Sequence, residues 1–184
     1  LLGYRSVGID VDPTSVLISQ HKTALDSVNC EELQRVCESM QAASRERQPS
    51  LFFEEPGYSL IDWERYIVRV PEPMRYRLTK RGNEEGYDLL GEIENDSAKA
   101  LCLIAQVPAH LQSLFRVCLS HALTKKIRLR FVGIGNGRFT FDVAKTRVLD
   151  MFLTKAYHML ATAEAFNWLH QLGVRLSEIQ VHRD

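Results

Sequence analysis

The spacing of hydrophobic and polar positions changes near the start of the chain. Residues 4–11, YRSVGIDV, form a largely apolar run that predicts a buried strand. Asp12 and Pro13 follow as an N-cap residue and a first helical residue, so a helix is predicted to about residue 25. The chain therefore opens with a strand–helix unit, and two carboxylates, Asp10 and Asp12, stand at its junction.

Helical and strand-like patterns follow in the middle of the chain. Apolar residues at helical spacing predict a helix over residues 30–47, a helix that begins near Asn95 and restarts at Pro108, and a long helix over residues 145–172. The long helix carries few charges, so we expect it to be buried on much of its surface. Between residues 58 and 94, the segments RYIVRV, MRYRLT and YDLLGEIE predict strands separated by prolines and a turn.

A β-hairpin is predicted just before the long helix. Apolar and polar residues alternate in IRLRF and again in FTFDV, and Asn136-Gly137 between them is a typical hairpin turn. The glycines at positions 133, 135 and 137 also suggest a phosphate-binding loop, but such a loop opens a helix and spaces its third glycine differently. We therefore expect these glycines to turn a hairpin.

The composition is typical of a folded protein, and the net charge is zero. Of 184 residues, 45% are hydrophobic and 25% are charged, and 23 Lys and Arg balance 23 Asp and Glu. A role in nucleic-acid binding therefore depends on local basic patches. The 4 cysteines are too few for a disulfide scaffold, and no apolar run reaches the length of a membrane span. We expect reduced thiols, no membrane partner and a cytoplasmic location.

Two segments of the chain are locally basic. Residues 65–81 hold six Lys or Arg and one acid, whereas residues 125–147 hold seven and one. Acidic residues between positions 84 and 96 follow the first segment closely and could neutralise it by cross-strand pairing. The second segment has no such neighbour, so we predict that it contacts the phosphate backbone of DNA. The residues assigned to this contact are Lys125, Lys126, Arg128, Arg130 and Arg138.

An acid at the carboxyl end of a strand is a typical ribose-binding residue. Asp10 occupies such a position, where its carboxylate can accept hydrogen bonds from both ribose hydroxyls. Val11, the apolar residue after it, can lie against one face of an adenine, whereas Asp12 is needed to cap the helix. The alternative is that both acids are structural, so that one ends the strand and the other caps the helix.

The opening segment LLGYRSVGIDVDPTSVLISQHKTAL resembles the second conserved segment of S-adenosylmethionine-dependent methyltransferases. It is most similar to the enzymes that methylate amino groups in DNA. The resemblance implies that Asp10 holds the cofactor ribose and that Val11 packs on the adenine. Near the end of the chain, IQVHRD resembles the third conserved segment, a short strand followed by an acid, which implies that Asp184 lies near the adenine amino group.

The resemblance also implies a fold and a domain organisation. The fold class would be α/β, with a partial Rossmann-like S-adenosylmethionine-binding sheet formed by residues 1–30 and 173–184. Residues 31–172 would form a large mixed α+β insertion, with antiparallel hairpins and a long buried helix, that takes part in target recognition. We therefore expect residues 4–11 and 178–183 to be neighbouring parallel strands, although they are far apart in the sequence.

The implied function is methylation of an exocyclic amino group of DNA bases. S-adenosyl-L-methionine would be the cofactor, and DNA and the rest of the methyltransferase chain would be the partners. Such enzymes flip the target base and need no metal ion. The family's glycine-rich loop and its Asp/Asn/Ser-Pro-Pro-aromatic catalytic motif do not occur in this sequence. We therefore assign no catalytic residue and expect the isolated chain to be inactive.

Two other functions fit parts of the sequence. One is a non-catalytic α+β module that binds DNA or protein. The other is a haloacid-dehalogenase-like phosphatase, because DVDPT matches the Asp-x-Asp-x-Thr motif, with Asp10 as nucleophile and Asp12 as acid/base. That chemistry also needs a Lys and a second acidic pair, which we do not identify. A zinc site on Cys118 is not expected, because His110 and His121 would lie about 16 Å apart along a helix.

Overall fold

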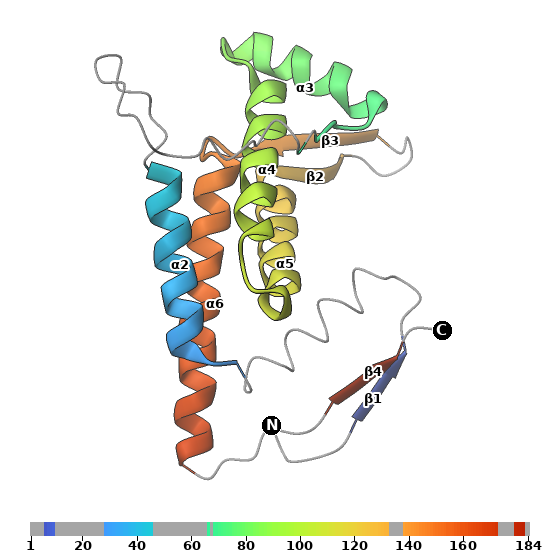
Figure 1. Ribbon diagram of the computed structural model, residues 1–184. Helices are drawn as coiled ribbons and strands as arrows, with labels where there is room; N and C mark the ends of the chain where they lie inside the picture. Colours follow the sequence, from blue (N-terminus) through green and yellow to red (C-terminus); the bar gives the residue numbers. More distant parts are fainter. Residues whose placement is uncertain are drawn as a thin grey trace, which may run out of the picture.

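The computed structural model describes residues 6–9, 28–45, 66, 68–132, 138–172 and 179–182 (Figure 1). The helices are α2 (Cys30–Arg45), α3 (Glu72–Glu85), α4 (Leu89–Ala105), α5 (Ala109–Lys126) and α6 (Val148–Gln171). The strands are β1 (Ser6–Ile9), β2 (Ile127–Val132), β3 (Arg138–Val143) and β4 (Ile179–His182). The described part of the chain is therefore mostly helical.

α6 is the central helix of the helical body. It packs against α2, α4 and α5, and α4 also packs against α5 (Figure 1). Phe115 of α5 meets Phe152 of α6 edge to face, with ring centroids 6.4 Å apart. The apolar stripe predicted for α5 is buried in this core and consists of Leu111, Leu114, Phe115, Cys118, Leu119 and Ala122.

The expectation that the long helix is buried on much of its surface holds for the side of α6 that packs against α2, α4 and α5. α6 buries one face, formed by Val148, Phe152, Ala156, Met159, Leu160 and Ala163. Its other side is open to solvent, and Trp168 is 59% exposed there. Charges are scarce on this exposed side as well, because small and hydroxyl side chains cover much of it. These residues are Thr154, Ala161, Thr162 and Ala165.

Residues 72–94 are helical except for a short turn, so the strands predicted at MRYRLT and YDLLGEIE are wrong. Pro71 and Pro73 do not separate strands here. They stand just before and within the first turn of α3, where proline is tolerated because its missing N–H has no helical partner. Leu78 and Gly82, four residues apart, form the buried face of this helix.

α4 begins well before the predicted helix start near Asn95. α3 ends at Gly86, which has a φ of 77° and closes the helix in the left-handed conformation. Asp88 then caps α4, because its carboxylate accepts a hydrogen bond from the Gly91 amide at 2.9 Å. Of the predicted strand RYIVRV, the described residues Tyr66 and 68–70 belong to no strand.

β1 and β4 lie side by side as parallel strands (Figure 1). Ser6 stands opposite Ile179, and Ile9 stands opposite His182. The predicted pairing of residues 4–11 with residues 178–183 is therefore confirmed. The described residues add no third strand to this pair, so the wider Rossmann-like sheet is not shown. The predicted cofactor residues Asp10, Val11 and Asp184, like the helix predicted to residue 25, lie outside the described residues.

β2 and β3 form the antiparallel hairpin that the alternating pattern predicts. Ile127 stands opposite Val143, and Val132 stands opposite Arg138. The base of the hairpin packs on the helical core through Ile127, Phe141 and Val143. Its predicted turn at residues 136–137 lies outside the described residues.

Two general expectations also concern the described residues. Cys30, Cys37, Cys102 and Cys118 are all free thiols, so no disulfide links the helices. Among the helices described, we find none that is both long enough and apolar enough to cross a membrane.

Candidate nucleic-acid interface

The first half of α4 carries three acids that bind cations from other parts of the chain. Glu92 pairs with Lys126 at the end of α5, Glu94 with Arg75 of α3, and Asp96 with Arg147 just before α6. In each pair the closest nitrogen and oxygen atoms are 2.6 Å apart. α4 therefore acts as the helix to which three neighbouring elements are attached at one end of the body.

Glu94 holds α3 and the segment before it. Its carboxylate accepts a hydrogen bond from the Arg75 guanidinium at 2.6 Å and another from the Val70 amide at 2.9 Å. The end of α3 also lies very close to the start of α4. A Cβ atom on Gly82 would come within 2.6 Å of the Tyr87 carbonyl oxygen, so only glycine fits there without a shift.

Lys126 is fully buried, with an exposed fraction of 0%. Its ammonium group lies 2.6 Å from the Glu92 carboxylate and donates a hydrogen bond to the Thr146 carbonyl at 3.1 Å. Its own carbonyl accepts a hydrogen bond from the Ala144 amide at 2.9 Å. The assignment of Lys126 to a DNA contact is therefore wrong, because its charge is used to close the base of the hairpin.

Asp96 binds the chain that follows the hairpin, where α6 begins. Its side chain is fully buried and accepts hydrogen bonds from the Arg147 guanidinium at 2.6 and 3.2 Å. It also accepts a hydrogen bond from the Leu149 amide at 3.3 Å, so it caps the start of α6 from a different helix. The hydrogen bond to Asp96 raises the pKa of Arg147 above its ordinary value.

These contacts place α3 and the hairpin at the same end of the helical body. Glu92 and Asp96 hold the chain on both sides of the hairpin, and Glu94, between them on α4, holds α3. In Figure 1 the strands β2 and β3 accordingly leave the body beside the start of α4, where α3 also packs. Both locally basic segments of the sequence thus meet at one end of the molecule.

The ion pairs divide the basic residues into two groups. Arg75 and Arg147 bind acids of α4, and Arg81 pairs with Glu85 of its own helix at 2.8 Å. Neutralisation of the first basic segment is therefore only partial, and it occurs between and along helices instead of across strands. Six exposed basic residues at this end have no ion-pair partner in the described part of the chain: Arg69, Arg77, Lys80, Lys125, Arg128 and Lys145.

The remaining DNA-contact predictions concern the hairpin and its base. Lys125 and Arg128 are exposed, as a phosphate contact requires. Arg128 stands opposite Asp142 in the hairpin register, so an acid lies beside it. Arg130 stands opposite Thr140, and Arg138 begins β3, but the side chains of both arginines lie outside the described residues.

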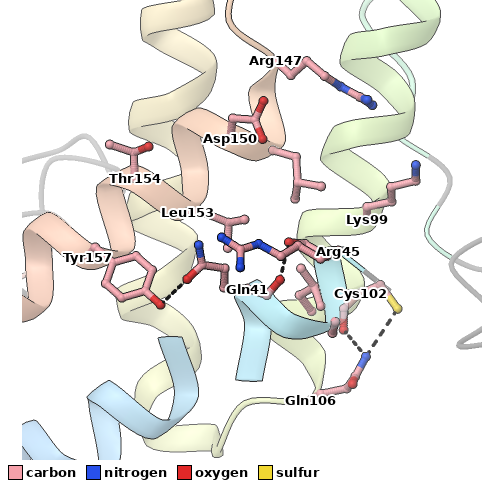
Figure 2. Close-up of a pocket in the computed structure, with 14 residues that line it drawn as sticks. Gln41, Arg45, Lys99, Cys102, Gln106, Arg147, Asp150, Leu153, Thr154 and Tyr157 are labelled. Atoms are coloured by element: carbon pink, nitrogen blue, oxygen red, sulfur yellow. Dashed lines mark hydrogen bonds between the residues drawn. The ribbon is translucent and has the colours of Figure 1, made fainter. Parts of the chain in front are cut away.

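A polar cleft of about 660 Å³ lies between α2, α4 and α6 (Figure 2). Its wall includes the cations Arg45, Lys99 and Arg147 and one acid, Asp150. Several of its polar groups bind one another. The Tyr157 hydroxyl donates to the Gln41 side chain at 2.6 Å. Burial raises the pKa of Tyr157, so its hydroxyl keeps its proton. No pairing of nucleophile and base is found among the described residues of this cleft.

The histidine and cysteine residues considered for zinc all lie on α5, but their environments differ. His110 is exposed, and its Nε2 lies 3.2 Å from Glu32. Cys118 is buried against the Met159 sulfur, and burial raises the pKa of its thiol to about 12. Burial and nearby cations, chiefly Lys155, lower the pKa of His121. Within the described part of the chain, no cluster of these residue types and acids suits a metal ion.

No protein-family model matches the chain, and no curated protein or solved structure matches it either.

Proposed function

We propose that the chain is a segment of an S-adenosylmethionine-dependent methyltransferase that modifies an exocyclic amino group of DNA. The observation that supports this most strongly is the parallel pairing of β1 with β4. Parallel neighbours need a long crossover connection, and here that connection contains the helical body. Such an arrangement agrees with a cofactor-binding sheet that carries a large insertion.

The register of this pair bears on the cofactor residues. Ile9 and His182 stand opposite each other at the carboxyl ends of the two strands. Asp10 follows the first strand directly, and Asp184 comes two residues after the second. Because ligands of open α/β sheets bind at the carboxyl ends of the strands, this register supports a shared adenosine site for the two acids.

The pair also argues for a wider sheet around it. Parallel sheets are normally covered on both faces, and two strands alone have little independent stability in water. A parallel pair of this kind is therefore best explained as part of a larger α/β sheet. This is the kind of sheet that the proposed function requires.

In this function the residues of the chain bind and orient, and the cofactor supplies the activated methyl group. Asp10 accepts hydrogen bonds from the ribose hydroxyls, Val11 packs on the adenine, and Asp184 accepts from the adenine amino group. The basic end of the helical body holds the DNA backbone while the target base is flipped out. Orientation of the amino nitrogen toward the methyl group accounts for much of the rate.

Titration of the complete enzyme, which includes this segment, with S-adenosylmethionine in a calorimeter tests this proposal. Asp10→Ala should weaken binding by at least about tenfold, because a hydrogen bond to a charged group contributes about 1.5–3 kcal/mol. Asp12→Ala is the matched control: it should lower stability by about 1 kcal/mol through the lost helix cap and leave the affinity nearly unchanged. Equal affinity in Asp10→Ala and the wild type would contradict the proposal.

A non-catalytic DNA-binding module is the second candidate. The observation in its favour is the gathering, at one end of the helical body, of basic residues that have no ion-pair partner among the described residues. Such a surface can bind DNA without a cofactor. The same titration separates the two functions. DNA binding without any binding of S-adenosylmethionine would favour the module.

A further inference from the structure

We propose that the outer face of α3 is a second DNA-binding surface, which contacts the phosphate backbone through Arg77 and Lys80 beside the exposed ring of Tyr76. The choice of DNA as the partner rests on the proposed function. The surface is separate from the hairpin, and no ion pair among the described residues uses its charges.

The burial pattern of α3 leaves this face open. Leu78 is fully buried and Gly82 packs against the start of α4, so these residues form the inner face. Tyr76 is 75% exposed, the highest value among the large hydrophobic residues described. Tyr76 and Lys80 are four residues apart and Arg77 and Lys80 three apart, so the three side chains neighbour one another on the helix surface.

The charges of this face are not paired within the part of the chain that the structure describes. Arg75 and Arg81, on the same helix, bind Glu94 and Glu85. Neither Arg77 nor Lys80 has an ion-pair partner in the described part of the chain. Like charges at this spacing repel each other, and a nearby anion removes that cost. Two adjacent cations and a tyrosine are typical of contacts with phosphate and sugar.

The location of α3 favours a long, rigid anion over a small one. The ion pairs of Glu92, Glu94 and Asp96 fix α3 and the hairpin base to the same half of α4. Two basic surfaces on separate elements at one end of the molecule can follow successive phosphates of a duplex. A membrane surface is a poorer match, because the apolar side of α3 is packed on α4 and has nothing to insert into lipid.

Binding of duplex DNA to the chain, measured by fluorescence anisotropy over a range of salt concentrations, tests this inference. The variant Arg77→Gln/Lys80→Gln should bind more weakly to all sequences and lower the log–log salt slope by about two, one for each phosphate contact. Arg35→Gln/Arg116→Gln is the matched control. It removes the same charge from exposed residues of α2 and α5, and the salt slope should not change.

A third variant, Arg128→Gln, separates the possible failures. If the hairpin variant lowers the salt slope and the α3 variant behaves like the control, the α3 surface is overturned and the proposed DNA function stands. If the wild-type chain does not bind duplex DNA at all, both fail. Thermal melting of each variant shows whether a loss of binding reflects unfolding, and the exposure of all these side chains predicts that it does not.

The tyrosine has its own pair of variants. Tyr76→Ala should weaken binding, because the ring that lies against sugar and phosphate is removed. Tyr76→Phe keeps the ring and should bind nearly as well as the wild type. Unchanged binding in Tyr76→Ala would show that this residue is not part of the surface. Unchanged binding in both Tyr76→Ala and Arg77→Gln/Lys80→Gln would overturn the DNA contact of α3 and favour an acidic protein as its partner.

Discussion

Asp96 connects two helices, because all the hydrogen bonds that its side chain accepts come from outside its own helix. It lies in α4, yet it accepts hydrogen bonds from the Arg147 guanidinium and from the Leu149 amide at the start of α6. The partner Arg147 keeps a side chain that is 55% exposed, so only the carboxylate is fully removed from water. A buried charge of this kind is stabilising only while its partners remain in place.

We expect Asp96→Asn to lower the free energy of unfolding by about 2 kcal/mol. The amide keeps the size of the side chain but loses the charge that binds the guanidinium, and hydrogen bonds to charged groups contribute about 1.5–3 kcal/mol. Asp150→Asn, at an exposed acid in the first turn of α6, serves as the control and should cost about 0.5 kcal/mol or less. Urea unfolding measures both, and equal small losses would show that Asp96 does not hold the junction.

Lys126 shows why single residues of the interface could not all be found from the sequence. In the run KKIRLRF, Lys125 and Lys126 are equivalent by composition and by position relative to the strand. The fold separates them, because Glu92 of α4 lies within reach of only one. That acid is more than thirty residues earlier in the chain, so no local pattern contains the information.

Among the elements, the segment from α3 to the start of α4 was the hardest to predict. In MRYRLT, apolar and basic residues alternate as they do in a half-buried strand, and prolines stand on its N-terminal side. The helix forms because Pro71 and Pro73 fit its first turn and because Leu78 and Gly82 face α4. The helical spacing of the buried residues becomes clear only when α4 is in place to cover them.

We expect Gly82→Ala to destabilise the chain by about 1–3 kcal/mol, although alanine favours helices more than glycine does. The new Cβ would lie 2.6 Å from the Tyr87 carbonyl oxygen and 3.0 Å from the Leu89 amide nitrogen, which are backbone atoms that cannot move aside alone. Thr79→Ala, on the exposed side of the same helix, should be neutral or slightly stabilising. Thermal unfolding compares the two, and a stabilised Gly82→Ala would contradict the close approach of α3 and α4.

The hairpin and the helices α2, α5 and α6 were predictable, because each has one face on the core and therefore a clear period. The alternation in IRLRF and FTFDV appears as the register of β2 and β3, with Leu129 opposite Phe141 and Phe131 opposite Phe139. In α5, residues three and four apart form the buried stripe. The hydrophobic pattern does not show how the helices and the hairpin pack together. The ion pairs of α4 determine that arrangement.

At the scale of the whole molecule, the helical body comes between β1 and β4 in the sequence, and these two strands pair with each other. This arrangement was predicted from two short segments at opposite ends of the sequence, and the pairing of β1 with β4 confirms that part. The basic end of the body was predicted only in part, since the DNA contact was assigned to residues 125–147 and the acids after residues 65–81 were thought able to neutralise that segment. DNA as the partner of this basic end and S-adenosylmethionine as the cofactor are proposals, and binding experiments test both.

Ribose recognition by Asp10 is the claim that connects the strand pair to a methyltransferase. The most direct measurement is a calorimetric comparison of S-adenosylmethionine with its 2′-deoxyribose analogue on the complete enzyme, both with the wild-type residue and with Asp10→Ala. The wild type should bind the analogue about tenfold more weakly, because one hydrogen bond to the carboxylate is lost. Asp10→Ala should bind both compounds equally. If the wild type does not distinguish the two compounds, or if Asp10→Ala distinguishes them as strongly as the wild type does, Asp10 does not hold the ribose and the account is wrong.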